Sequence, residues 1–374
     1  MLIDVKNLDI DIVEKRGMPG AVFKDPEIFD RETKTVFRNG WASVASVQQL
    51  KEPGDIIPIK IAGFSLLIMK DARGEIGVFH NVCRHKGAPL IDKPCNKRVV
   101  VCPYHRWSFQ TNGEFIGAPC FYRDQSKQMP SEEKAGKGLL AVRFAIWWDT
   151  IFVNISGEAE PFEEFIRPLN DLLSDYDSQN LNMISSTEYE SSSNWKLAVD
   201  NFLDGYHVPF VHSQAVTLKA VLKQEDLFLS DDIVGLRLAN GASDKPAKTD
   251  KPLPHFAGLP EEKTGMQQWF GIFPNTLFFV DPRWMQMILI RPEAADYSTE
   301  TLSLYTVSKE AASDEYKEQR ENLSVVLNEV NRQDIELLDK LQHSRTREAA
   351  DQGTLVEAWD QVAIGFHKAW LKKI

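Results

Sequence analysis

The sequence predicts an α+β protein in which a small β-rich part precedes a larger part of strands and helices. Two observations support this fold class. In residues 36–155, short apolar runs alternate with Gly, Pro and Asp, which is typical of strands joined by turns. Beyond this point helical patterns appear between the strands, and a long helix is expected over residues 313–351.

The strands of the first part are expected in three stretches. Residues 56–71 contain two apolar runs around an Ala-Gly pair, residues 98–105 contain one run, and residues 139–155 contain two more. Residues 156–166 then mark a change toward helix. Such short runs indicate a small antiparallel β domain.

In the second part, a helix is expected to begin near Ser193 or Asn194, because both residue types are common N-caps. Residues 271–293 and 298–310 have the pattern of strands in a larger sheet. Residues 241–265 are polar and rich in Pro and Lys, which predicts a long loop of the kind that forms lids or mobile segments.

Composition places the chain among ordinary globular proteins. Of its 374 residues, 43% are hydrophobic and 26% are charged, which is enough for two domains with apolar cores. The net charge of −11 argues against a nucleic-acid-binding groove, which needs a basic surface. No apolar run reaches about 18 residues, so no membrane span is expected. The N-terminus lacks the apolar region of a signal peptide, so we expect a cytoplasmic protein with reduced cysteines.

Four residues form the first candidate metal site: Cys83, His85, Cys102 and His105. They read C-x-H and C-x-x-H, separated by 16 residues. They can hold one zinc ion, or a [2Fe–2S] cluster with both thiolates on one iron and both imidazoles on the other. Each segment supplies one Cys and one His, whereas zinc sites more often pair like with like, so the cluster is favoured. Cys95 and Cys120 lack a ligand pattern and are expected to be small apolar fillers.

A second candidate site follows the expected helix start. His207 and His212 are five residues apart, too far round for one helical face. Pro209 disfavours helix at the residue before it, which lets the chain bend and bring the two histidines together. Asp200, Asp204 and His207 have the spacing i, i+4, i+7 and are expected on one helix face. The alternative is that these acids face solvent, because burying them is costly without partners.

A third ligand is expected from the long helix. Its apolar positions follow helical spacing: Leu323, Val326, Leu327, Val330, Leu337, Leu338 and Leu341. Asp334 lies inside that stripe, whereas Glu336 and Asp339 point away from it. A buried carboxylate needs a cation or hydrogen-bond donors, and two histidines with one carboxylate form the facial set that holds non-haem Fe(II). His207, His212 and Asp334 fit that set. Two weaker candidates nearby are not selected as ligands: Gln333 and Gln342.

Together, the paired Cys/His loops, the D-x-x-H-x4-H segment and a late helical aspartate resemble the Rieske non-haem iron oxygenases. More narrowly, the chain is similar to the large (α) subunit of the aromatic-ring-hydroxylating dioxygenases, and its segment DNFLDGYHVPFVH looks like the choline-monooxygenase version. The resemblance covers most of the chain. By position it implies the following roles: Cys83, His85, Cys102 and His105 on a [2Fe–2S] cluster; His207, His212 and Asp334 on mononuclear Fe(II); Asp204 as a bridging carboxylate; Asn201 as an amide near the iron; and Trp107 beside the cluster.

The resemblance also implies an architecture. A β-rich Rieske domain is expected over residues 38–156. An α+β catalytic domain, with a curved antiparallel sheet that grips a helix, is expected over residues 157–374, and residues 1–37 are expected to pack on it. Members of the family are often homotrimers, in which electrons pass from the cluster of one subunit to the iron of its neighbour through the bridging aspartate.

The implied activity requires O2, a small organic substrate and a supply of electrons. The chain has no Gly-rich dinucleotide fingerprint, so the electrons are expected from a separate NAD(P)H reductase, with or without a ferredoxin. That partner is expected to dock near His85, His105 and Trp107. Candidate substrate-pocket residues precede the long helix: Trp269, Phe270, Phe273, Phe279, Trp284 and Met287. Some of them are expected to be plain core, because about half of a strand's side chains face one side.

The substrate class stays open at this level. Aromatic side chains can hold an arene by stacking or a trimethylammonium group by cation–π contacts. The carnitine-type relatives often carry Glu at the bridging position, where this chain has Asp204. We therefore expect mono- or dioxygenation of an aromatic or other small organic substrate, as in aromatic hydrocarbon catabolism. The alternative is oxidation or N-demethylation of a quaternary amine such as choline, betaine or carnitine. The rival classes are a Rieske electron carrier, which has no use for a second iron, and a zinc-stabilised binding protein.

Overall fold

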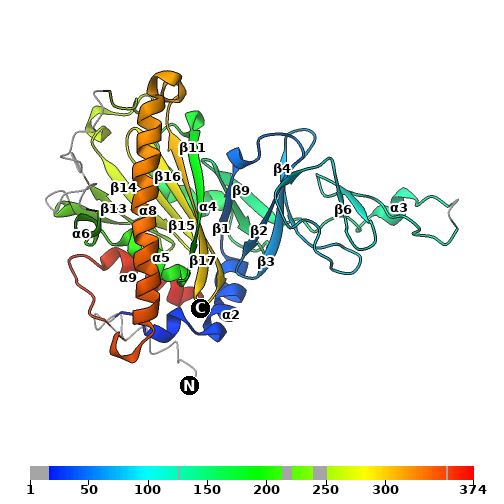
Figure 1. The fold of residues 1–374 in the computed structure, drawn as a ribbon, viewed down its shortest axis with the longest axis horizontal. Helices are drawn as coiled ribbons and strands as arrows, with labels where there is room; N and C mark the ends of the chain where they lie inside the picture. The colour runs from blue at the N-terminus through cyan, green and yellow to red at the C-terminus, as the bar shows by residue number, and fades with distance from the viewer. Residues whose placement is uncertain (1–16, 125–126, 213–220, 239–250, 351–352) are drawn as a thin grey trace. The chain divides into compact units, whose positions relative to one another are not determined.

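The computed structural model describes residues 17–124, 127–212, 221–238, 251–350 and 353–374 (Figure 1). The chain forms two compact units. One is Val44–Glu158, and the other joins the described residues of Met1–Ser43 to those of Ala159–Ile374. Of the expected long loop, residues 241–250 lie outside the described residues. Among the helices that the structure describes, none has the length and apolar character needed to cross a membrane.

The unit Val44–Glu158 consists mainly of short strands in three sheets, with the orders β1-β10-β9, β4-β3-β2-β5 and β6-β7-β8. The strands are β1 (Ala42–Ser46), β2 (Asp55–Ile61), β3 (Phe64–Lys70), β4 (Ile76–His80), β5 (Cys95–Asn96), β6 (Val99–Val101), β7 (Ser108–Gln110), β8 (Phe115–Gly117), β9 (Arg143–Trp147) and β10 (Thr150–Asn154). A short helix, α3 (Ser131–Lys134), follows β8. Phe79, Val100 and Phe109 belong to the apolar core, and the same core contains Cys83 and Cys102.

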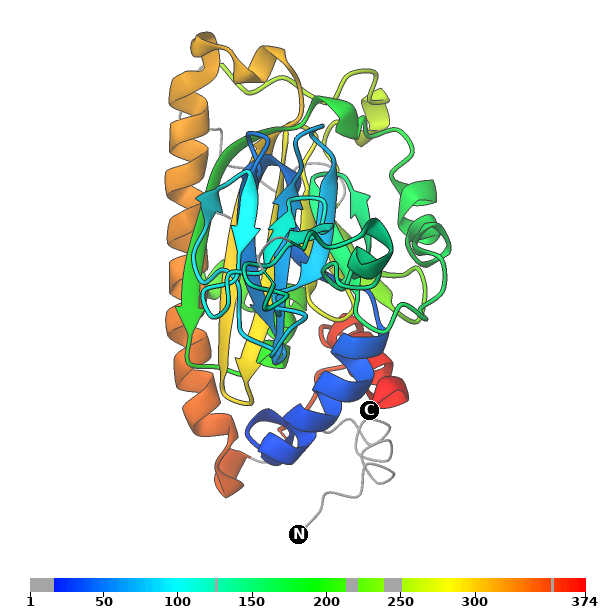
Figure 2. The same cartoon turned by 90° about the vertical axis from the view of Figure 1, so that its right-hand side faces the viewer.

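The larger unit contains a seven-stranded antiparallel sheet in the order β11-β17-β16-β15-β14-β13-β12. The strands are β11 (Asn182–Ser191), β12 (Gln224–Phe228), β13 (Ile233–Leu238), β14 (Gln267–Ile272), β15 (Thr276–Val280), β16 (Trp284–Ala294) and β17 (Tyr297–Thr306). The helices are α2 (Pro26–Glu32), α4 (Phe162–Leu172), α5 (Trp195–Leu203), α6 (Val208–Val211), α8 (Lys317–Arg345) and α9 (Gln361–Lys373). Figure 2 shows α8 running along β11. This mixture of helices and antiparallel sheets confirms the predicted α+β class.

Short turns connect these elements. A π-helical turn covers Thr33–Phe37, and 3-10 turns cover Gly20–Phe23, Val47–Gln49, Ser178–Asn180, Glu261–Lys263, Glu310–Ala312, Asp314–Tyr316 and Glu348–Ala350.

The strand register decides which side chains of the large sheet face the helices. The Tyr189 hydroxyl on β11 donates a hydrogen bond to the Asn328 side chain on α8 at 2.5 Å. On β14, a Cβ added to Gly271 would lie 3.0 Å from Leu203 of α5, so glycine there lets the helix approach the sheet. We call this side the inner face. Residues that pair across neighbouring strands point to the same face. One such row on the inner face crosses the sheet: Leu236, Trp269, Phe279, Gln286 and Leu304.

α5 begins where the sequence predicts. The Asn194 side chain accepts a hydrogen bond from the Lys196 backbone N–H at 3.0 Å and caps the helix. A buried ion pair holds this end: Lys196 Nζ lies 2.5 Å from Glu32 Oε1, and both side chains are fully buried. The indole N–H groups of Trp195 and Trp370 donate to the same carboxylate at 2.9 and 2.7 Å. α2, α5 and α9 therefore meet at one fully hydrogen-bonded charge, which fixes the helix that leads into the second site.

The other end of α5 differs from the prediction. The helix ends at Leu203, and Asp204 follows it with extended backbone angles (φ −93°, ψ 96°). The prediction that Asp200, Asp204 and His207 share one helix face is therefore wrong. Asp200 Oδ1 instead lies 2.7 Å from Nε2 of His367 on α9. The chain turns after the helix, so contacts between Asp204 and His207 arise across a turn.

α8 begins a few residues later than predicted, and its expected apolar stripe is partly wrong. Its buried residues are Asn331, Ile335, Leu338 and Gln342. Val326, which was expected in the stripe, is 48% exposed. Asp339 is exposed, as expected, and its Oδ1 also accepts the Ser192 backbone N–H at 2.8 Å. The reason is that α8 packs on polar residues of β11. For example, the Ser324 hydroxyl of α8 bonds to the Ser185 hydroxyl of β11 at 3.0 Å, so the side of α8 that faces the sheet carries polar groups.

Candidate metal centres

The two Cys/His loops of the smaller unit have the same backbone design. In each loop the backbone N–H of the cysteine donates to the carbonyl oxygen of the residue five positions later. The backbone N–H of the residue four positions later donates to the carbonyl oxygen of the cysteine, and all four hydrogen bonds are 2.8–3.1 Å long. The returning N–H groups belong to Gly87 and Arg106, which both have positive φ (73° and 59°). The sequence thus uses one loop twice, and each copy presents Cys before His. A positive φ is unfavourable for arginine, so the surrounding structure has to hold Arg106 in this backbone conformation.

The thiols lie inside this arrangement, while the imidazoles lie toward solvent. Cys83 and Cys102 are buried, and burial, together with the nearby Cys102 thiol, raises the pKa of Cys83. The rings of His85 and His105 have centroids 4.6 Å apart. Backbone N–H groups of His85 and Lys86 bond to the Cys83 sulfur, a contact that orients a metal-binding thiolate and tunes it. Two adjacent thiols and two adjacent imidazoles fit a two-iron cluster better than one ion surrounded by all four.

Aromatic rings flank the two imidazoles. The Trp107 ring stacks on that of His85, with centroids 5.0 Å apart and planes 2° from parallel. Tyr104, which is 62% exposed, contacts the His105 ring at a centroid distance of 3.7 Å. The resemblance named Trp107 but not Tyr104. No spacing signal could have found an exposed tyrosine within a loop.

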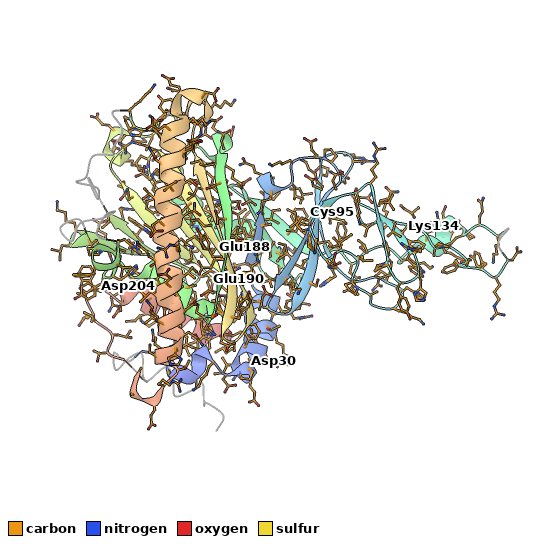
Figure 3. All side chains as sticks on the ribbon, in the orientation of Figure 1. Asp30, Cys95, Lys134, Glu188, Glu190 and Asp204 are labelled. Carbon is orange, nitrogen blue, oxygen red and sulfur yellow. The ribbon has the colours of Figure 1, made fainter. Side chains whose placement is uncertain are left out.

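The remaining cysteines differ from each other. Cys95, on β5, packs against the apolar core as predicted (Figure 3). Cys120 is exposed and has a positive φ of 53°, so its prediction as an apolar filler is wrong. The reason is that a residue in an exposed surface turn does not fill space in the apolar core.

In the larger unit, three potential ligands converge. Single donor atoms of His207, His212 and Asp334 all lie within 4.8 Å of one another. Asp334 Oδ1 lies 3.0 Å from His212 Nε2 and 3.6 Å from His207 Nε2. His207 is in the turn after α5, His212 ends α6, and Asp334 is on α8. The two histidines come together as predicted, with ring centroids 5.4 Å apart, but the prediction that Pro209 prevents helix at Val208 is wrong, because the short helix α6 begins at Val208 with Pro209 in its first turn.

Three neighbouring side chains also reach this centre. Asp204, which directly follows α5 (Figure 3), lies 3.4 Å from His207 Nδ1 through its Oδ2. Asn201 Nδ2 donates to Asp334 Oδ1 at 3.3 Å. Gln333, considered in the sequence and not selected, lies 2.9 Å from His212 Nδ1 through its Oε1. Gln342 is elsewhere, where its Oε1 accepts the Asn194 backbone N–H at 3.0 Å.

The electrostatics of the centre call for a cation. Burial lowers the pKa of His207, but the Asp204 and Asp334 carboxylates outweigh burial and raise it to about 9. Burial raises the pKa of Asp334, but its two histidine partners outweigh this and hold it below its usual value. In the absence of metal a proton therefore sits between the imidazole and carboxylate, at the place where a divalent cation fits. The ligand types and their spacing fit one mononuclear iron.

The sequence analysis missed one buried acid. Glu300, on β17, is fully buried on the inner face next to this centre. Burial and then the charge of Asp334 raise its pKa to about 7. Its signal in the sequence is its spacing: Glu300, Leu302 and Leu304 are two residues apart along a strand and therefore lie on the same face.

The register separates the candidate pocket residues. Trp269, Phe279 and Trp284 form a contact cluster, with Phe279 4.5 Å from Trp269 and 4.6 Å from Trp284 between ring centroids. The first two stand in the inner-face row. Phe270 and Met287 pair across strands with Phe278 on the opposite face, where all three are buried. Phe273 contacts Trp195 and Phe366 at the α5 and α9 end. The structure thus groups three of the six candidates toward the helices.

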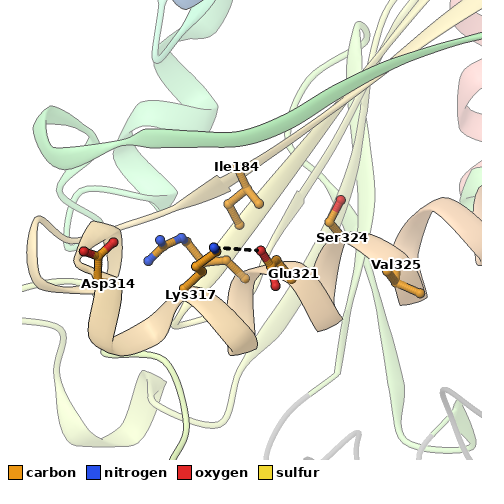
Figure 4. A pocket seen from close by; sticks show the side chains of 7 residues that line it. Ile184, Asp314, Lys317, Glu321, Ser324 and Val325 are labelled. Carbon is orange, nitrogen blue, oxygen red and sulfur yellow. Dashed lines mark ion pairs between the residues drawn. The ribbon is translucent and has the colours of Figure 1, made fainter.

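A separate pocket opens near the beginning of α8 (Figure 4). Its volume is about 500 Å³, and Lys317 and Glu321 form an ion pair in its lining at 3.8 Å. The lining residues are Ile184, Asp314, Lys317, Arg320, Glu321, Ser324 and Val325. Val325 precedes Asp334 by a helical rise of about 14 Å. This pocket is therefore not part of the metal centre.

Two family models match this chain. Residues 178–374 match the ring hydroxylating alpha subunit (catalytic domain), and residues 40–130 match the Rieske [2Fe-2S] domain. The chain belongs to the ring-hydroxylating alpha-subunit family. It is the terminal component of a Rieske oxygenase, an enzyme whose cofactors are a Rieske [2Fe–2S] cluster and mononuclear non-haem iron. The resemblance stated from the sequence is confirmed.

Curated relatives of this oxygenase include enzymes of two substrate types. Choline monooxygenase of Spinacia oleracea is 24% identical over 365 residues, covering 95% of this chain and 77% of the relative. The carnitine monooxygenase oxygenase subunit of Acinetobacter pittii is 24% identical, covering 93% and 91%. The anthranilate 1,2-dioxygenase large subunit of Acinetobacter baylyi is 25% identical, covering 93% and 80%.

Solved structures of both types share the fold. A quaternary ammonium Rieske monooxygenase, described for carnitine oxidation and inter-subunit electron transfer, superposes with a TM-score of 0.77 at 20% identity, covering 96% of this chain and 95% of the other. Naphthalene 1,2-dioxygenase from Rhodococcus sp. bound to indole also gives 0.77 at 20% identity, covering 98% and 96%.

Proposed function

We propose that this Rieske oxygenase uses His207, His212 and Asp334 to hold its mononuclear iron. The supporting observation is their convergence within 4.8 Å from three separate elements, with Asp334 on a helix far along the chain. The four residues that would hold the [2Fe–2S] cluster are Cys83, His85, Cys102 and His105. When bound, the cluster supplies single electrons and the iron binds and activates O2 for insertion into the substrate.

The chain's own residues provide placement and electrostatics. Asp204 faces Nδ1 of His207, where a carboxylate orients the ring and makes it a more basic ligand. Asn201 holds the Asp334 oxygen through its amide and so limits rotation of that carboxylate. These contacts fix the ligand geometry before substrate arrives. In our proposal Asp204 also carries electronic coupling from a cluster to the iron.

The substrate we propose is a small molecule with an apolar ring. Its support is the cluster of Trp269, Phe279 and Trp284, whose inner-face rings offer stacking surfaces. Mono- and dioxygenation are both compatible with this chemistry. The second candidate is a quaternary amine, because indole faces also bind trimethylammonium groups and curated relatives include choline and carnitine monooxygenases.

Further parts of the proposal concern partners. Electrons come from a separate NAD(P)H reductase, with or without a ferredoxin, that docks beside His85, His105 and Trp107. The enzyme works as a homotrimer in the cytoplasm, where its thiol ligands stay reduced. The domain arrangement expected from the sequence, with boundaries after residues 37 and 156, is part of the same proposal.

The test is a screen with reconstituted enzyme and a surrogate reductase. Arenes, aromatic acids and quaternary amines are added singly, and substrate-stimulated O2 and NADH consumption is measured together with product mass. Uptake coupled to a hydroxylated ring product supports the first candidate. Uptake stimulated by choline or betaines alone supports the second and reverses the ring preference. Trp269→Ala should lower the stimulated rate with either class, since both need its indole face.

The role of Asp204 has its own test. Asp204→Asn should keep both metals yet slow electron delivery from reduced cluster to iron, because an amide is a weaker partner for the His207 Nδ1–H. A single turnover of pre-reduced enzyme measures product per cluster. Asp231→Asn, an exposed carboxylate 74% accessible, is the matched control. Full product yield from metal-replete Asp204→Asn would rule out this role.

A further inference from the structure

The two ring nitrogens of His212 have different neighbours. Nε2 lies 3.0 Å from Asp334 Oδ1, whereas Nδ1 lies 2.9 Å from Gln333 Oε1. Nε2 is the nitrogen that faces the centre shared with His207. It can bind a metal only if the proton of the neutral ring is on Nδ1. A neutral imidazole can carry that proton on either nitrogen, so something has to select the tautomer.

The orientation of the Gln333 amide makes this selection. Gln333 Nε2 donates to Glu329 Oε1 at 3.2 Å. A carboxylate only accepts hydrogen bonds, so the NH2 end of the amide turns toward Glu329 and its oxygen toward His212. That oxygen also only accepts, so His212 Nδ1 has to donate. The reversed amide would place oxygen against carboxylate and NH2 against the ring nitrogen.

Glu329 is itself held in the ionised form. Arg332 donates to it twice, from Nε to Oε2 at 2.8 Å and from Nη2 to Oε1 at 2.6 Å. These hydrogen bonds lower the pKa of Glu329. The Arg332–Glu329 pair is about half exposed, with side-chain accessibilities of 51% and 45%, while the His212 side chain is 3% exposed. A sequence of four side chains therefore runs from the surface to a buried ligand, and each fixes the next.

We propose that Gln333 is a positioning residue that selects the metal-binding tautomer of His212, and that Glu329 holds Gln333 in the required orientation. The inference rests on the proposed role of His212 as an iron ligand. It assigns different orienting groups to the two histidines, an amide for His212 and the Asp204 carboxylate for His207. Residues 329 and 333 are one turn apart on α8, so the helix that carries Asp334 also carries this support.

The test measures iron binding by the cluster-containing protein through anaerobic equilibrium dialysis, with cluster absorbance and thermal midpoint as checks on folding. Gln333→Leu removes the acceptor and should weaken Fe(II) binding by about 10–100-fold. Glu329→Gln combined with Gln333→Glu exchanges the carboxylate and the amide. In this variant the carboxylate at position 333 accepts a hydrogen bond from His212, and the amide at position 329 donates one to that carboxylate. Most of the affinity should therefore return. Glu336→Gln removes another carboxylate partner of Arg332 and should bind iron like the parent.

The outcomes separate this inference from the proposed function. Asp334→Ala is measured alongside. If it binds iron like the parent, the assignment of the iron site fails. If it loses iron while folded Gln333→Leu binds normally, only the positioning role fails. An exchange variant as weak as Gln333→Leu would also overturn the positioning role, because a merely structural glutamine predicts no rescue by a carboxylate at 333.

Discussion

Iron binding at the proposed site should become tighter as pH rises from 7 to 9. The structure raises the pKa of metal-free His207 to about 9, because Asp204 and Asp334 outweigh the effect of burial. The ring therefore carries a proton at neutral pH, and that proton has to leave before Nε2 can bind a metal. The perturbation is pH alone, applied to the cluster-containing protein without its mononuclear iron.

The size of the effect follows from the pKa. Competition between one proton and the metal weakens binding about tenfold for each pH unit below the pKa, or about 1.4 kcal/mol per unit. From pH 7 to pH 9 the affinity should thus rise about 50-fold and then level off. An unperturbed histidine with a pKa near 6.5 would give a rise of only about 1.3-fold over the same range.

The sign also holds for the stability of the metal-free protein. A raised pKa stabilises the fold below the unfolded value near 6.5, and this contribution is lost as pH rises through about 9. Metal-free protein should therefore lose stability over the interval in which iron binding strengthens. Equilibrium dialysis of Fe(II) at a series of pH values, without oxygen, measures the first trend, and urea unfolding measures the second.

Asp204→Asn supplies the internal comparison. It removes the carboxylate nearest Nδ1, so the pKa of His207 should fall and the pH slope should shrink. Asp231→Asn changes the charge equally at an exposed site and should keep the parental slope. A parent affinity that is flat between pH 7 and 9, with one mononuclear iron still bound per chain, would refute the proton-competition reasoning.

Three further outcomes follow. Cys102→Ala should abolish the visible absorbance of the cluster while mononuclear iron still loads, and an unchanged spectrum would contradict the ligand assignment. Asp334→Ala should lower the iron content from about three to about two per chain, whereas Glu336→Ala, on an exposed side of the same helix, should leave it unchanged in elemental analysis. Glu32→Gln should destabilise the protein by about 3–5 kcal/mol, because a buried ammonium loses its charged partner. Urea unfolding measures this, and Glu27→Gln at the exposed start of the same helix serves as the control, with equal losses in both arguing against the buried pair.

The sequence predicted the fold class and the two sets of metal ligands from short patterns. The Cys/His loops can be recognised from sequence because cluster chemistry requires Cys and His at close spacing. The start of α5 at Asn194 can be recognised because a helix N-terminus needs a side-chain acceptor. Asp334 was found from helical phase, although the apolar stripe used for it is only partly buried. The helical phase still distinguishes the two acids, because Asp334 lies one residue from Ile335 and four from Leu338, which are buried, while Glu336 is exposed.

The sequence by itself thus determined the pattern of candidate metal ligands, since this pattern depends on local spacing and on ligand chemistry. Tertiary structure alone decided what those residues touch. The turn after α5 sent Asp200 to His367 and Asp204 to His207. The pairing of β14 with β15 put Trp269 and Phe279 in one row. Packing of α8 put Gln333 beside Nδ1 of His212. Such contacts join positions far apart in the chain, and a helical or strand period carries no information about its partner.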